Sequence, residues 1–117
     1  MKLTKNQKHE ILKSFLRIIS KITDKKYQKH AWIEGNASDF EEFVCLFFDL
    51  VDPILDKYED YSISRNQYKL LKRFRDEFEA FADKNSQPSG FIETSEWARI
   101  IKKALQVLKS FNFTEAE

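Results

Sequence analysis

The spacing of apolar residues constrains the fold of this chain more than any other feature of its sequence. In four segments, apolar residues recur every three or four positions, which gathers them on one face of an α-helix. Three segments also open with the capping-box pattern that marks a helix N-terminus, formed by Thr4 with Gln7, Ser38 with Glu41, and Ser64 with Gln67. We therefore expect residues 1–117 to form one all-α domain, an antiparallel bundle of four main helices plus one or two short helices.

The boundaries of the helices follow from these signals. We expect main helices at about 5–22, 39–51, 65–82 and 95–110, a short helix after Asp24, a loop at DKNSQPSG, and a frayed tail over 110–117. Pro53 cannot donate a helical hydrogen bond, so the second helix either kinks there or restarts as a piece of about 53–60. The last helix is expected to bury Trp97, Ile100, Ile101, Ala104, Leu105 and Leu108.

Composition excludes several other classes of protein. Glycine and proline number two each, which leaves few tight turns and argues against an all-β fold. A single cysteine, Cys45, excludes an intramolecular disulfide and a cysteine-based zinc site. The N-terminus lacks the uninterrupted apolar stretch of a signal peptide, and no run of about 18 apolar residues predicts a membrane span. We expect a cytoplasmic protein that makes no membrane contact.

The net charge of +1 conceals a strong asymmetry along the chain. Residues 1–30 hold nine Lys/Arg and two Asp/Glu, whereas residues 31–60 hold one Lys and nine Asp/Glu. Such blocks of charge are typical of an interaction surface, and they are equally typical of two helices that attract each other within one fold. The sequence leaves both interpretations open.

The acidic block has a regular geometry on the second helix. At 100° per residue, the Phe-rich face lies opposite an arc of about 120° to 200° from Phe40. That arc contains Glu42, Cys45, Asp49, Asp52 and Asp56. Like charges at helical spacing destabilise a helix, and no lysine in the arc relieves the repulsion. We predict a solvated face or a docking surface for a basic partner, formed by Glu42, Asp49, Asp52 and Asp56 with Glu59 and Asp60 at its rim.

The sequence contains no catalytic or metal-binding signature. His9 and His30 lie in different segments and take part in no Glu-x-x-His or His-x-x-x-His pattern, so a di-iron bundle is not expected. Two separated glycines cannot form a phosphate-binding loop. Thiol catalysis by Cys45 has no local support, because a lone cysteine on an apolar helix usually serves packing. We expect no catalytic residue, no metal and no cofactor, and hence a protein that is not an enzyme.

Nucleic-acid binding is the alternative function that the charges suggest. It would use the run Lys69, Lys72, Arg73 and Arg75, and it predicts binding that weakens with salt. Acidic residues lie within a turn of this run, and a sequence pI near 7.8 gives little bulk attraction to phosphate. The expectation is therefore that nucleic acid is not the partner.

The closing segment, FIETSEWARIIKKALQVLKSF, together with the acidic helix face, resembles the small all-α immunity proteins of bacterial toxin systems. These are the immunity proteins of contact-dependent growth inhibition and of nuclease bacteriocins. The resemblance implies a cytoplasmic protein that binds a cognate toxin tightly and blocks its active site. Many such toxins are basic nucleases, which an acidic surface can mask by mimicking phosphate. No binding residue is transferred from these families, and the sequence does not set the oligomeric state.

Overall fold

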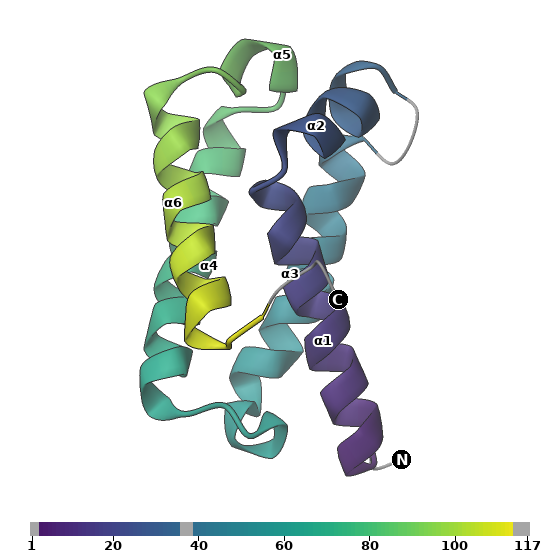
Figure 1. Ribbon diagram of the computed structural model, residues 1–117, viewed down its shortest axis with the longest axis vertical. Coiled ribbons are helices and arrows are strands. Elements are labelled where there is room, and N and C mark those ends of the chain that lie inside the picture. Colours follow the sequence, from purple (N-terminus) through teal and green to yellow (C-terminus); the bar gives the residue numbers. More distant parts are fainter. Residues whose placement is uncertain (1–2, 36–38, 114–117) are drawn as a thin grey trace.

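The computed structural model describes residues 3–35 and 39–113, which form an all-α bundle (Figure 1). Among these residues no strand is present. The elements in chain order are α1 (Lys5–Ile22), α2 (Lys25–Gln28), a π-helical turn η1 (Lys29–Ile33), α3 (Phe40–Asp56), a 3₁₀ turn η2 (Tyr58–Tyr61), α4 (Arg65–Lys84), α5 (Pro88–Phe91) and α6 (Ser95–Ser110).

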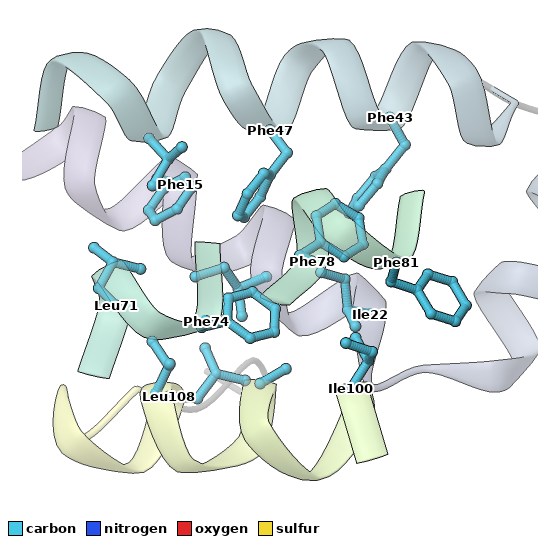
Figure 2. Close-up of a cluster of buried hydrophobic side chains, with 14 of the residues drawn as sticks. Phe15, Ile22, Phe43, Phe47, Leu71, Phe74, Phe78, Phe81, Ile100 and Leu108 are labelled. Atoms are coloured by element: carbon cyan, nitrogen blue, oxygen red, sulfur yellow. The ribbon is translucent and has the colours of Figure 1, made fainter. Parts of the chain in front are cut away.

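The four long helices run alternately up and down, as expected for antiparallel neighbours joined by short connections (Figure 1). α1 packs against α3 and α6, and α4 packs against the same two helices. α3 and α6 therefore lie on opposite sides of the core (Figure 2). α2, η1 and α5 close one end of the bundle (Figure 1). This arrangement leaves one long side of α3 at the molecular surface.

Side-chain caps fix where the helices begin. Both predicted capping boxes that fall on described residues are present, at Thr4 with Gln7 and at Ser64 with Gln67. In each box the hydroxyl accepts a hydrogen bond from the third helical amide, and the Gln side chain accepts one from the cap amide. Thr94 caps α6 in the same position, which confirms the predicted start of that helix.

α3 differs from its prediction at both ends. Its N-cap is Asp39, whose carboxylate accepts a hydrogen bond from the amide of Glu42. The expected capping box of Ser38 with Glu41 depends on Ser38, which lies outside the described residues. Pro53 does not break the helix, which continues to Asp56 before η2 begins. The predicted piece at 53–60 is thus the end of α3 followed by a 3₁₀ turn.

Two other segments are more ordered than the sequence suggested. The expected loop DKNSQPSG contains the end of α4 and the start of α5, which opens with Pro88 at its first position. The predicted frayed tail is wrong for residues 110–113, because Phe111 and Phe113 pack against the core. Asn112 adopts a left-handed conformation, and the amide of Phe113 bonds to the carbonyl of Leu108 in a Schellman-type helix end. Residues 114–117 lie outside the described part of the chain.

The core is dominated by aromatic rings from the long helices. Phe43 and Phe47 of α3 point towards Phe74 and Phe78 of α4 (Figure 2), with the ring centroids of Phe47 and Phe78 4.9 Å apart. On α6 the predicted burial is wrong for Leu105, which is 51% exposed. Leu105 lies at the margin of the helix face, and Val107 is buried instead.

Candidate docking surface

The six acidic residues predicted from the sequence all lie at the surface of α3 and η2. We call them the acidic stripe: Glu42, Asp49, Asp52, Asp56, Glu59 and Asp60. Each is exposed, while the Phe40, Phe43 and Phe47 side chains of the same helix are buried. The predicted division of α3 into an apolar inner face and an acidic outer face is therefore confirmed.

The continuity of α3 through Pro53 keeps the stripe in line. Because the helix does not break, Asp52 and Asp56 project on the same side as Asp49. Proline has no amide proton, so it cannot donate the helical hydrogen bond to the carbonyl of Asp49.

Asp52 is held by a cation from the neighbouring helix. Arg75 of α4 donates from Nε to Asp52 Oδ1 at 3.0 Å and from Nη1 to Asp76 and Glu79, each at 3.1 Å. Its guanidinium lies 5.2 Å from the ring centroid of Phe48, in a cation–π contact. The hydrogen bond to Asp52 raises the pKa of Arg75, against the opposing effect of burial. Arg75 is thus a structural link between α3 and α4.

The rest of the basic run on α4 is partly neutralised as well. Lys72 bonds to Asp76, with its Nζ 3.2 Å from Oδ2. Burial acts to raise the pKa of Asp76, but the hydrogen bonds from Lys72 and Arg75 outweigh it and hold that pKa below its usual value. Of the four basic residues proposed for nucleic-acid binding, two are therefore engaged by acids of the protein itself.

The basic first helix does not neutralise the stripe. Among residues 3–35 and 39–113, its one ion pair to the stripe joins Lys8 to Asp60, at 3.9 Å. Lys21 instead lies over the ring of Tyr27, with its Nζ 4.9 Å from the centroid. Four members of the stripe form no ion pair with any described residue: Glu42, Asp49, Asp56 and Glu59. The alternative of two helices that cancel each other's charge accounts for only a small part of the acidic block.

The N-terminal half of α3 also carries a shallow hollow that the sequence did not predict. Its lining consists of Asp39, Glu41, Glu42, Cys45, Leu46 and Asp49. Leu46 is 45% exposed, and Cys45 is exposed too, so the expected packing role of Cys45 is wrong. The helical wheel could have revealed Leu46, because it is an apolar residue well away from the Phe-rich face.

No group of three or more His, Cys, Asp or Glu side chains within residues 3–35 and 39–113 is arranged to hold a metal ion. No helix in this part of the chain is long and apolar enough to cross a membrane. Comparison with protein-family models, with curated proteins and with solved structures finds no match to the chain. The surface geometry is therefore the main guide to function.

Proposed function

We propose that this chain is an inhibitory binding protein that docks its acidic stripe onto a basic protein toxin, in the manner of a bacterial immunity protein. The toxin would be a nuclease domain whose active site the stripe covers. The observation that supports this proposal is the set of four exposed carboxylates, Glu42, Asp49, Asp56 and Glu59, without a cationic partner among the described residues. The cytoplasm is where such an inhibitor would act.

The energetics of the stripe favour a partner. Asp49, Asp52 and Asp56 follow each other at spacings of three and four residues, where like charges destabilise a helix. Lysines of a partner would relieve this repulsion, and complementary potentials would also steer the two proteins together. Rim pairs would contribute mainly to the association rate, whereas pairs that lose their water on binding would contribute to affinity.

The nucleic-acid alternative has less support. Binding to phosphate requires cations that are free to release their counterions. Lys72 and Arg75 are already engaged by Asp76 and Asp52, and the open acidic stripe would repel a nucleic acid that approached α3. Lys69 and Arg73 alone would give a small basic patch.

The proposal predicts that an adjacent reading frame encodes a toxin domain, and the test is whether this chain inhibits that domain. We expect the wild-type chain to abolish nucleic-acid cleavage by that domain at equimolar concentration. Asp49→Lys should lower the affinity about tenfold or more, because it removes one attraction and adds one repulsion. The measurement is the association rate and affinity by surface plasmon resonance, alongside the cleavage assay.

The matched control is Asp83→Lys, an equal change of charge at an exposed position near the end of α4. It should alter the affinity by less than about threefold, because Asp83 is not a member of the acidic stripe and solvent screens exposed charges outside the contact. Equal binding by wild type and Asp49→Lys, with both folded, would contradict the site. An adjacent frame that encodes no toxin, or a toxin that the chain leaves fully active, would contradict the function.

A further inference from the structure

The exposed side of α3 has apolar residues beside its carboxylates. Leu46, Leu50 and Pro53 are spaced four and three residues apart, which places them on one side of the helix, next to the stripe. Leu46 is 45% exposed, Leu50 is half-buried and Pro53 is exposed. Large apolar side chains at a helix surface are common singly, but this ridge runs parallel to a row of anions.

The two ends of the stripe differ in how many of their carboxylates are paired, although Asp56 and Glu59 at the C-terminal end are also unpaired with described residues. In the C-terminal half of the stripe, Arg75 binds Asp52 and Lys8 approaches Asp60. In the hollow around Leu46, by contrast, no carboxylate is paired with a cation from residues 3–35 or 39–113. The lining of the hollow thus combines one exposed apolar side chain, Leu46, with carboxylates that would not have to leave a cation of the described residues to bind a partner.

We propose that the hollow around Leu46 receives an amphipathic basic segment of the protein partner, with an apolar side chain on Leu46 and flanking Lys or Arg on Glu42 and Asp49. This inference rests on the proposed function and adds the chemistry of the contact. Charge complementarity favours a basic protein segment, because the carboxylates repel nucleic acid and anionic lipid. The exposed Leu46 side chain favours a segment that also carries an apolar residue over a simple cation. A small apolar anchor surrounded by polar contacts is a common arrangement at protein interfaces.

A symmetric contact between two copies through this face would bring the same carboxylates together, which is unfavourable. A head-to-tail contact is the remaining way for a second copy to occupy the hollow, using the lysines around α2. That contact would generate chains of molecules, so it makes a distinct prediction for the molecular mass in solution.

The test uses the full chain and two synthetic helical peptides of about 18 residues, or about five turns. Both carry the same lysines along one side, and they differ in whether Leu or Ser lies between those lysines. At physiological salt, we expect the Leu peptide to bind wild type roughly fivefold more tightly than the Ser peptide, from the apolar area removed from water. Affinities come from calorimetry, and amide shifts in NMR spectra locate the bound peptide.

Leu46→Gln should remove the preference for the Leu peptide, because it replaces the exposed apolar side chain with a polar one that still favours a helix. Leu105→Gln is the matched control, since Leu105 is similarly exposed on α6, across the core from α3. The control should retain the preference. Circular dichroism of both variants should match wild type.

The outcomes separate this inference from the function on which it rests. Equal binding of the two peptides to wild type would contradict the proposed apolar contact at Leu46, and so would a preference that survives Leu46→Gln. Neither result would contradict docking through the acidic stripe. If Asp49→Lys lowers the affinity neither for the peptides nor for the toxin domain, the proposal of an acidic docking surface is wrong as a whole. Self-association of the wild-type chain in sedimentation, lost in Leu46→Gln, would assign the hollow to a second copy and overturn the proposed occupant.

Discussion

Gln28 is the residue on which the closed end of the bundle most depends. Its side chain is fully buried, and its Oε1 accepts a hydrogen bond from Nε1 of Trp97 at 3.0 Å. Its Nε2 donates to the carbonyls of Lys21 and Ile22, at 3.0 and 2.7 Å. The Gln28 amide therefore provides hydrogen-bond partners for carbonyls at the end of α1 and for the indole N–H on α6, two segments that are far apart in the sequence.

Gln28→Ala should lower the free energy of unfolding by about 2–4 kcal/mol, because it removes the partner of the buried Trp97 N–H and of the Ile22 carbonyl. The Lys21 carbonyl still accepts a hydrogen bond from the amide of Asp24. Urea denaturation followed by circular dichroism measures the change. Gln106→Ala, at an exposed position of α6, should change stability by less than about 0.5 kcal/mol. A Gln28 variant as stable as the control would show that water or a shifted neighbour replaces the amide.

The sequence predicts the direction of some side chains on α3 but not their contacts with other helices. The outward direction of Asp49 and Asp56 could be predicted, because it depends only on helical periodicity. The capture of Asp52 by Arg75 could not, since the two residues are 23 positions apart and meet only when α3 packs on α4. Leu105 lies at the margin of the apolar face of its helix, where periodicity alone does not decide burial, and it is 51% exposed.

At the scale of elements, the predictions were most accurate where a cap marks the chain. α1 and α6 begin and end at the predicted positions, because Thr4 and Thr94 each accept a hydrogen bond that starts a helix. α5 was missed, since four residues containing Pro88 and Gly90 have little helical propensity of their own. η1 was missed as a π-turn because such turns have no clear sequence signal, although a short helix was expected there.

The C-terminal end of α3 has an electrostatic cost that can be measured. Asp56 is its last residue, no basic residue occupies its last turn, and an acid there interacts unfavourably with the helix dipole. Asp56→Lys should therefore raise the free energy of unfolding by about 0.5–1 kcal/mol. The same change should weaken binding to the toxin domain, so stability and function would move in opposite directions.

Glu41→Lys provides the contrast within the same helix. It reverses the charge in the first turn of α3, where an acid is favourable, so stability should fall by a few tenths of a kcal/mol. Thermal unfolding of both variants at low salt measures the two shifts. Shifts of the same sign would show that the dipole does not govern charge preference in α3.

At the scale of the whole molecule, one continuous core joins all the long helices. Buried residues of α1, α3, α4 and α6 form a single cluster with Phe91 and Trp32 at the closed end. The side chain of Gln67, at the start of α4, also donates to the carbonyl of Ser110 at the end of α6. Neither half of the chain has a separate core of its own.

Unfolding in urea should therefore be a single cooperative transition. Tryptophan fluorescence reports on the closed end, where the rings of Trp32 and Trp97 lie 6.0 Å apart, and far-UV circular dichroism reports on every helix. The two signals should give the same midpoint and slope. A fluorescence midpoint at clearly lower urea would mean that the closed end melts before the long helices do.

Cys45 allows a crosslinking reagent to be attached within the hollow. It is the single thiol of the chain and it is exposed among the carboxylates. A photoreactive crosslinker attached to that sulfur would sit within reach of any bound protein without altering a single acidic group. Covalent adducts recovered after illumination would therefore identify, by mass spectrometry, the peptide of the partner that lies over α3.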